Sequence, residues 1–478
     1  MLGGFRLCDL YYLLFSIVYL VTYKLYINKR LPKSGWRKSF FSQFLAIPLV
    51  IFGIAFVIYS FYHFLSPKFR HHPELFVPQL KENLINPFVW KSSMPVNTHF
   101  VAGSMRFLFS DICDEFTCYD LTKDEKSEIF SEYSNHQLRK TEHPINNSIK
   151  NVIFILLESF LSVSSDLYVG GKEITPFLNN LKKDSTIYYN GEILPNITIG
   201  ESGDGQLIYM SGLLPLKNRI TVGIAKRRTL LGLPQILKER FGIKYSEIII
   251  PSSPVLWEQK YMNERYGIDF MLSATDTIGT SAFLINEETV FSLAENTKKE
   301  EKQPFFSMVL GISTHQPYNE PIDTEFTIAD PSIPIQYNNY LIACHYVDKQ
   351  IEKYFNFLRE KKIYDNSLII IASDHHPHID QLHMEGKVSK ELPLYIINSG
   401  IDVETMYHGR ANQLDVYTTI LDILGIESEW RGLGNTLLSP FYTNSVDEKK
   451  YELSQKIIMG NYFKEIQCCN AYKKKHLR

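Results

Sequence analysis

The stretch "IIIASDHHPH", residues 369–378, decides how this sequence is interpreted. Its Ile residues end a short apolar run, which is typical of a buried strand. One Asp and three His follow at once, namely Asp374, His375, His376 and His378. Because carboxylates and imidazoles are common metal ligands, the end of this strand is a candidate metal site. Asp374 and His375 are the candidate ligands.

Four more apolar runs have the same character and alternate with helical patterns. This alternation predicts an α/β fold with a mostly parallel sheet flanked by helices. In open sheets of this kind, ligands bind beyond the carboxyl ends of the strands. The runs are "NVIFILLES" (151–159), "YSEIIIPS" (245–252), "PFFSMVLGIS" (304–313) and "LPLYIINSG" (392–400).

Residues with metal-binding chemistry follow three of the five runs. Glu158 ends the first run, His315 follows the third, and Asp374 with His375 follows the run quoted at the start. A single Glu at a strand end is more often a helix cap, and a single His is usually solvated. Together they predict a site for Mn²⁺, Mg²⁺ or Zn²⁺, since carboxylate oxygens and one imidazole suit these ions.

A candidate nucleophile lies in "NITIGESGDGQLIYMSGLLPL", residues 196–216. Ser202 is placed between glycines, just before a helical pattern. These glycines allow the backbone to approach a ligand closely, and a helix N-terminus favours an anion. From spacing alone, an ordinary loop and helix cap is the better explanation of the pattern.

Composition excludes several classes of protein. The chain has 478 residues, enough for at least one large α/β domain. Its formal net charge is −2, whereas a nucleic-acid partner usually requires a clear basic excess, so none is expected. Six cysteines in so long a chain do not form a disulfide framework. Cys113 and Cys118 are close enough in sequence to pair, or they remain free.

Two N-terminal stretches, 8–27 and 40–65, are apolar and long enough to cross a bilayer. We expect two transmembrane helices; a signal peptide followed by a buried helix, or two core helices, are the alternatives. The loop between them carries five Lys or Arg residues. The positive-inside rule therefore places this loop in the cytoplasm and the chain after residue 66 outside.

The sequence predicts four parts along the chain. Residues 1–66 form a membrane anchor, and residues 67–149, which are rich in Pro and then in charge, form a tether with short helices. Residues 150–440 form the catalytic domain, and residues 441–478 form a C-terminal tail.

An ordered set of motifs runs from about residue 150 to 436. After Glu158 come "EITPFLNNL" (173–181), "GESGDGQ" (200–206), "STHQPY" (313–318), "YDNSLIIIASDHH" (364–376), "QLDVYTTILDILG" (413–425) and "RGLGNTLL" (431–438). This set resembles the sulfatase-like membrane transferases of the lipoteichoic acid synthase type, in the alkaline phosphatase superfamily. The order of the motifs is far more specific than any one of them.

The resemblance implies one divalent metal held by Glu158, Ser202, Asp374 and His375, with Mn²⁺ preferred and Mg²⁺ or Zn²⁺ as alternatives. Ser202 would be the nucleophile, and His315 would contact the transferred phosphate or assist proton transfer. The donor would be a phospholipid of the bilayer, and the headgroup would be phosphoglycerol or phosphoethanolamine. The acceptor would be an envelope glycan or glycolipid, reached on the extracytoplasmic side of a bacterial plasma membrane.

The chain departs from the family at the headgroup site. Where the family has an Asp five residues before a Trp and an Arg two residues after it, this chain has Ser252, Trp257 and Gln259. Loss of an Arg matters because its planar fork suits phosphate. Either Lys260 replaces it, or the donor has a cationic head such as ethanolamine. The expected substrate-binding residues are Trp257, Lys260, His315 and His376.

Three other functions remain open. A sulfatase would need a Cys/Ser-x-Pro-x-Arg sequence, which is not found around Ser202. A two-metal phosphatase or phosphodiesterase is compatible with the spacing between Asp374 and His378. A non-catalytic envelope protein could keep the fold for binding, but the complete ligand set argues against a decayed site.

Overall fold

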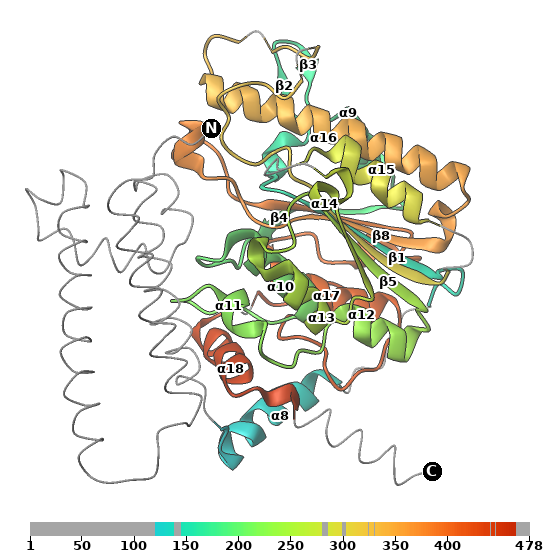
Figure 1. The fold of residues 1–478 in the computed structure, drawn as a ribbon, viewed down its shortest axis with the longest axis vertical. Helices are drawn as coiled ribbons and strands as arrows, with labels where there is room; N and C mark the ends of the chain where they lie inside the picture. The colour runs from blue at the N-terminus through green and yellow to red at the C-terminus, as the bar shows by residue number, and fades with distance from the viewer. Residues whose placement is uncertain are drawn as a thin grey trace, which may run out of the picture. The chain divides into compact units, whose positions relative to one another are not determined.

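The structure is a computed structural model (Figure 1). It describes residues 120–137, 145–279, 285–298, 303–323, 325–328, 330–439, 441–444 and 446–464. The predicted membrane helices, 8–27 and 40–65, and most of the predicted tether lie outside these residues. Within the described ranges, no helix combines the length and apolar character needed to cross a bilayer.

An eight-stranded sheet with the strand order β10-β4-β9-β8-β1-β7-β5-β6 forms the centre. In this sheet β9 runs antiparallel to both neighbours, and the other strands run in one direction. All five apolar runs form strands, and the predicted fold class is confirmed. The strands are β1 (Asn151–Leu157), β4 (Tyr188–Leu194), β5 (Tyr245–Ile250), β6 (Phe270–Ser273), β7 (Phe305–Leu310), β8 (Ser367–Ser373), β9 (Leu392–Ile397) and β10 (Ala411–Asn412), with a separate hairpin of β2 (Tyr168–Val169) and β3 (Lys172–Glu173).

Helices cover both faces of the sheet (Figure 1). One face packs against α9 (Pro176–Lys183), α15 (Glu287–Thr297) and α16 (Ile335–Glu360). The other packs against α10 (Glu201–Ser211), α12 (Leu233–Ile236) and α17 (Gln413–Ile423). Further helices are α8 (Lys123–Gln137), α11 (Thr221–Ala225), α13 (Gln259–Tyr266), α14 (Ala274–Ile278) and α18 (Glu448–Met459), and a π-helical turn, Leu237–Phe241, continues α12.

The two cores follow from the alternation of side chains along each strand. On β1, Phe154 packs into the core with α10 and α17, whereas Ile153 and Ile155 pack into the core with α9, α15 and α16. A strand that is buried on both faces needs apolar residues at every position. This explains the continuous apolar runs in the sequence.

The C-terminal segment differs from the predicted tail. Residues 448–459 form α18, in which Leu453, Ile457 and Ile458 are buried in the same core as α10 and α17. Leu453 and Ile457 are one helical turn apart, and with the adjacent Ile458 they give α18 an apolar face, which packs into this core. The compact unit therefore continues to at least residue 464.

The strand order brings the predicted site residues to one edge. β1 lies between β7 and β8, and all three run in parallel. Leu157 and Ser373 are paired in register, so Glu158 and Asp374 directly follow paired positions. The Asp374 N–H donates to the Leu157 carbonyl at 3.0 Å, a normal hydrogen-bond length.

Candidate active site

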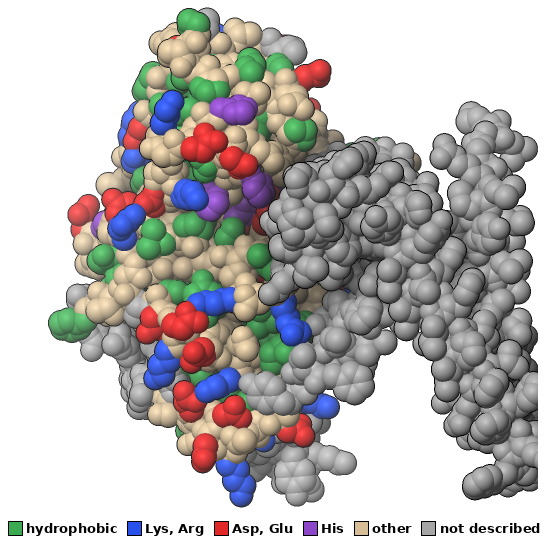
Figure 2. All heavy atoms as spheres, turned by 90° about the vertical axis from the view of Figure 1, so that its left-hand side faces the viewer, with side chains coloured by type: hydrophobic (Ala, Val, Ile, Leu, Met, Phe, Trp, Pro, Cys, Tyr) green, Lys and Arg blue, Asp and Glu red, His purple; other side chains and the backbone are tan. Residues whose placement is uncertain are grey.

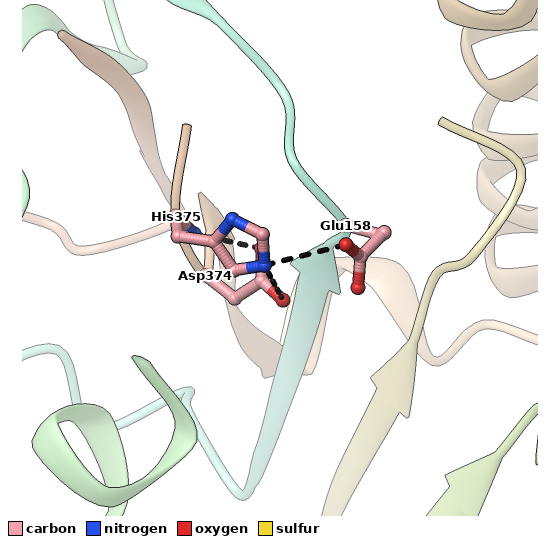
Figure 3. A group of neighbouring side chains, drawn as sticks. All are labelled: Glu158, Asp374 and His375. Atoms are coloured by element: carbon pink, nitrogen blue, oxygen red, sulfur yellow. Dashed lines mark hydrogen bonds and ion pairs between the residues drawn. The ribbon is translucent and has the colours of Figure 1, made fainter. Parts of the chain in front are cut away.

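Three buried side chains lie at the carboxyl ends of β1 and β8. We call Glu158, Asp374 and His375 the ligand cluster; one donor atom from each lies within 4.8 Å of the others. The His375 Nε2 is 3.3 Å from Glu158 Oε1 and 3.7 Å from Asp374 Oδ2. In Figure 3 the His375 ring points toward both carboxylates.

Neighbouring groups fix the orientation of these ligands. Asp374 Oδ1 accepts hydrogen bonds from the backbone N–H groups of Ser159 at 2.8 Å and His375 at 2.7 Å. The Ser159 hydroxyl donates to Glu158 Oε1 at 2.7 Å. The His375 Nδ1 lies 2.7 Å from the His376 carbonyl, so Nδ1–H donates there and Nε2 is the ring nitrogen that faces the cluster.

The charges in the ligand cluster shift the pKa of each member. Burial and the neighbouring Glu158 charge raise the pKa of Asp374 to about 8. Burial by itself lowers the pKa of His375, but Asp374 and Glu158 raise it to about 10. Burial by itself raises the pKa of Glu158, and the charge and hydrogen bond of His375 lower it to about 2. The shifts show that Asp374 and His375 hold protons tightly beside Glu158, and a divalent cation bound by these atoms would displace those protons.

Ser202, the second residue of α10, lies beside this cluster. Its hydroxyl is 3.2 Å from Glu158 Oε2 and 3.1 Å from His375 Nε2. Gly205 makes this approach possible, because a Cβ there would lie only 2.3 Å from the Asp374 carbonyl oxygen. The structure therefore brings the predicted nucleophile and the three other predicted ligands together.

The backbone around the site is held in uncommon conformations. Ser159 has φ 49° and Glu201 has φ 43°, a region that residues with side chains rarely adopt. Ser159 directly follows the predicted ligand Glu158, and Glu201 directly precedes the predicted ligand Ser202. Asp204 stabilises the turn before α10 by accepting from the backbone N–H groups of Thr198 and Gly200, both at 2.9 Å.

A pocket opens beside Ser202 and the ligand cluster. Trp257 and His315, both predicted to bind substrate, line it. Lys260 is exposed and His376 is half-buried, and neither belongs to the lining. The other lining residues are Leu156, Glu158, Glu201, Ser202, Pro251, Ser252, Leu256, Gln259, Leu310, Gly311, Ile312, Gln316 and Asp374.

Gln259, which stands where the resemblance implies an Arg, bonds to other amides. We call Gln206, Gln259 and Asn263 the amide cluster; all three are buried. The Gln259 Nε2 donates to Gln206 Oε1 at 2.6 Å, and Asn263 Nδ2 donates to Gln259 Oε1 at 3.3 Å. Gln206 Nε2 lies 3.5 Å from Asn263 Oδ1 and completes the ring. The ring links α13 to α10, the helix that carries Ser202.

His378 lies at the rim of the site. Its Nε2 is 2.8 Å from Glu201 Oε1, and 42% of its side chain is exposed. Histidine side chains gather in the middle of the face shown in Figure 2, beside charged side chains of both signs. The extra histidines of the opening stretch thus lie outside the ligand cluster.

The donor set fits a divalent metal ion. It offers carboxylate oxygens and one imidazole nitrogen, with the Ser202 hydroxyl next to them, as suits Mn²⁺, Mg²⁺ or Zn²⁺. In the part of the chain that the structure describes, Glu158, Asp374 and His375 are the group of such side chains that lies close enough to hold an ion.

Two residues that shape the site were not predicted. Ser159 contacts both carboxylates of the ligand cluster, and Gln413, at the start of α17, donates to the Asp374 carbonyl at 2.6 Å. Ser159 could have been found as the residue that directly follows a predicted ligand. Gln413 begins one of the quoted motifs, but its partner is a backbone carbonyl that the sequence does not reveal.

Comparisons with known proteins show the family to which the chain belongs. The family described as "Sulfatase" matches residues 150–426, more than half of the chain. The chain belongs to the sulfatase family. This family is part of the alkaline phosphatase superfamily of metal-dependent enzymes, and the predicted resemblance to the lipoteichoic acid synthase type is confirmed.

Relatives in the sulfatase family and its superfamily include lipoteichoic acid synthase 2 of Bacillus subtilis (strain 168), which is 26% identical over 393 residues. This match covers 73% of the chain and 59% of the relative, so the chain spans about three-fifths of that protein's length. The lipoteichoic acid synthase LtaP from Listeria monocytogenes shares the fold, with a TM-score of 0.57, 17% identity, and coverage of 70% of this chain and 97% of that one. The Streptococcus pyogenes phosphoglycerol transferase GacH, solved in complex with sn-glycerol-1-phosphate, has a TM-score of 0.50, 14% identity, and coverage of 72% and 94%.

Proposed function

We propose that the protein is a metal-dependent transferase that moves a phospholipid-derived phospho-headgroup to an envelope glycan or glycolipid. The observation that carries this proposal is the position of the Ser202 hydroxyl, 3.2 Å from Glu158 and 3.1 Å from His375 at the start of α10. A hydroxyl in this place can be both a ligand and a nucleophile. The names of the relatives, lipoteichoic acid synthase and phosphoglycerol transferase, support the same reaction.

Transfer proceeds in two displacements at phosphorus. The Ser202 hydroxyl gives its proton to water, its oxygen bonds to phosphorus, and the bond from phosphorus to the diacylglycerol oxygen breaks. His315, which lines the pocket, supplies a proton to that leaving oxygen. An acceptor hydroxyl, or water, then gives its proton to His315 and bonds to phosphorus, and the Ser202 oxygen leaves and takes a proton back from water.

The metal would be held by Glu158, Asp374 and His375 together with the Ser202 oxygen. Mn²⁺ is the first candidate. When bound, the ion would neutralise charge on the phosphoryl oxygens and lower the pKa of the serine hydroxyl. Ser159 keeps the two carboxylates oriented, because it contacts both of them.

The pocket favours phosphoethanolamine over phosphoglycerol as the headgroup. Its lining includes the carboxylates of Glu158, Glu201 and Asp374 and, over the described ranges, no Lys or Arg. Gln259 is engaged in the amide cluster, and Lys260 lies outside the lining. Once a dication neutralises two of the carboxylates, Glu201, which also pairs with His378, and the Trp257 ring would suit an ammonium group.

Among the described residues, the presence of one ligand cluster supports a one-metal transferase over a two-metal phosphatase. A second ion would use His378, whose Nε2 is paired with Glu201 at 2.8 Å. Metal content measured on the purified protein separates the two: one ion per chain supports the transferase, and two support the phosphatase.

The predicted spans, 8–27 and 40–65, would anchor the enzyme in the plasma membrane with the catalytic domain outside. This topology places the active site on the side where envelope acceptors lie. An introduced Cys near residue 300 should react with an impermeant reagent on intact cells, whereas one in the 28–39 loop should not. The reverse labelling pattern would invert the topology.

The experiment that tests the reaction measures diacylglycerol release. Purified full-length protein with Mn²⁺ is incubated with fluorescent phosphatidylethanolamine or phosphatidylglycerol. Ser202→Ala should lose turnover by more than about 1,000-fold, as other covalent enzymes do, while its thermal stability stays close to that of the wild type. Ser202→Thr should keep part of the activity.

Ser253→Ala, at a neighbouring exposed serine, is the matched control and should retain full activity. Wild-type release by folded Ser202→Ala protein would exclude the covalent mechanism. No release from either lipid by the wild-type protein would exclude the transferase.

A further inference from the structure

A buried carboxylate that the proposed reaction does not use lies behind the His315 loop. Glu287 is the first residue of α15, and only 1% of its surface is exposed. Burial raises the pKa of this carboxyl group. Since burying a carboxylate is costly unless its oxygens accept hydrogen bonds, its partners indicate what the residue does.

The partners of Glu287 belong to the loop that follows β7. Glu287 Oε1 accepts from the backbone N–H groups of Ile312 at 2.6 Å and Ser313 at 2.8 Å. Glu287 Oε2 accepts from the Ser313 hydroxyl. Gly311 leaves room for this carboxylate, because a Cβ there would lie 3.0 Å from Glu287 Oε1. One side chain thus fixes two consecutive backbone N–H groups of the loop.

The same loop reaches the active site through its next two residues. The His315 N–H donates to the Ile312 carbonyl at 2.8 Å, which closes the turn. The Thr314 hydroxyl donates to the backbone carbonyl of Glu158, a member of the ligand cluster. His315 itself lines the pocket. Glu287 is therefore connected to the pocket by one short turn of backbone.

We propose that Glu287 is a positioning residue that holds the loop 312–315 so that the His315 imidazole faces the pocket. The role of His315 in transfer rests on the proposed function, whereas the position of its ring does not. A carboxylate is suited to this task because one oxygen can accept two N–H groups while the other accepts a hydroxyl.

Activity of paired variants tests whether Glu287 acts through His315. Glu287→Ala should lower the rate of diacylglycerol release by about 100-fold, the loss expected when a reacting group is displaced by about 1 Å. Glu287→Gln, which keeps an acceptor oxygen, should recover part of this loss. In a His315→Ala background, Glu287→Ala should cost less than about threefold, because the two residues act as one unit.

Glu288→Ala is the matched control, since Glu288 is the next residue and its side chain is 64% exposed beside Lys353. It should release diacylglycerol at the wild-type rate. If Glu287→Ala lowers the rate of diacylglycerol release just as much in the His315→Ala background, the proposal is overturned. Glu287 would then act on the site by a route that does not involve His315.

A second measurement needs no substrate. The rate at which diethyl pyrocarbonate modifies His315, followed by mass spectrometry of the full-length protein, should change several-fold in Glu287→Ala. The rate at the exposed His383 should not change. An unchanged His315 rate in folded Glu287→Ala protein would refute the positioning role. If the wild-type protein releases no diacylglycerol, the proposed function fails and this chemical readout still decides the role of Glu287.

Discussion

The ligand cluster and the amide cluster meet the same pocket but are built from opposite chemistry. Glu158, Asp374 and His375 are ionisable, and their mutual charges shift every pKa in the cluster. Gln206, Gln259 and Asn263 are neutral amides joined in a ring. The first cluster is incomplete without a cation, whereas the second satisfies itself.

This difference separates the reaction from the recognition of substrate. The ligand cluster and Ser202 are the set that the family resemblance implies, and the proposed chemistry at phosphorus rests on them. Gln259 stands where the resemblance implies an Arg, and its buried amide joins α13 to α10. Under the proposed function, the pocket would keep the reaction of the family and change the headgroup on which it acts.

The largest effect should come from breaking the ligand cluster. Asp374→Ala removes one ligand and also the acceptor for the N–H groups of Ser159 and His375. Mn²⁺ affinity should fall by more than about 100-fold, since changes to groups that only support ligands already cost 10- to 100-fold, and turnover should be lost. Titration of Mn²⁺ into the purified protein measures this affinity.

His376→Ala is the control for this variant, because the His376 ring bonds to the Pro377 carbonyl outside the cluster. Metal content should stay near one ion per chain. Equal metal loss in both variants would place His376 among the ligands and would favour the two-metal phosphatase.

A smaller effect, on stability and not on binding, should come from breaking the amide cluster. Gln259→Ala leaves Gln206 Oε1 without its 2.6 Å partner and Asn263 Nδ2 without its 3.3 Å partner. An unpaired buried group costs about 1 to 3 kcal/mol. The free energy of unfolding, measured with urea, should therefore fall by an amount of this size. KM for the lipid should change little. A large increase in KM at unchanged stability would assign Gln259 to the substrate instead, and Gln381→Ala, at an exposed Gln, provides the control.

The smallest effect concerns the rim, where His378 and Glu201 form an ion pair at 2.8 Å. The hydrogen bond to Glu201 raises the pKa of His378, as does the charge of Asp380, while burial and His375 lower it. A raised histidine pKa contributes stability that is fully present below the unfolded value of 6.5 and is lost as pH rises through the folded value.

His378→Gln should therefore lower the free energy of unfolding by less than about 1 kcal/mol near pH 6 and by almost nothing near pH 9. Urea unfolding at the two pH values measures the difference, with the exposed His383→Gln as control. The same loss at both pH values would indicate a neutral hydrogen bond in place of the ion pair.

The sequence predicted the features that depend on order along the chain. Buried strands on both faces of a sheet produce continuous apolar runs, and residues such as Glu158 and Asp374 are recognisable because they end such runs. The position of Ser202 needed the family resemblance, since a Gly-rich turn before a helix is common without any catalytic role.

Features that depend on contacts between distant segments could not be predicted. Gln259 and Gln206 are 53 residues apart, and nothing local indicates that two amides bond to one another and not to a substrate. Strands β4 and β6 contain polar or short patterns that do not differ from loops. Likewise α18 has a weak apolar face, and only the core that it covers explains why it is not a tail.

Gly205 limits how this enzyme can be engineered. In a helix interior, replacing Gly by Ala improves helix propensity by about 1 kcal/mol, so a stabilisation programme that ranks substitutions by propensity would choose Gly205→Ala in α10. The added methyl group would lie 2.3 Å from the Asp374 carbonyl oxygen and would force α10 away from β8. A design ranked by helix propensity alone would thus include a variant in which α10 and Ser202 have moved, and stabilising changes are better sought in α18, which lies on the outer side of that core.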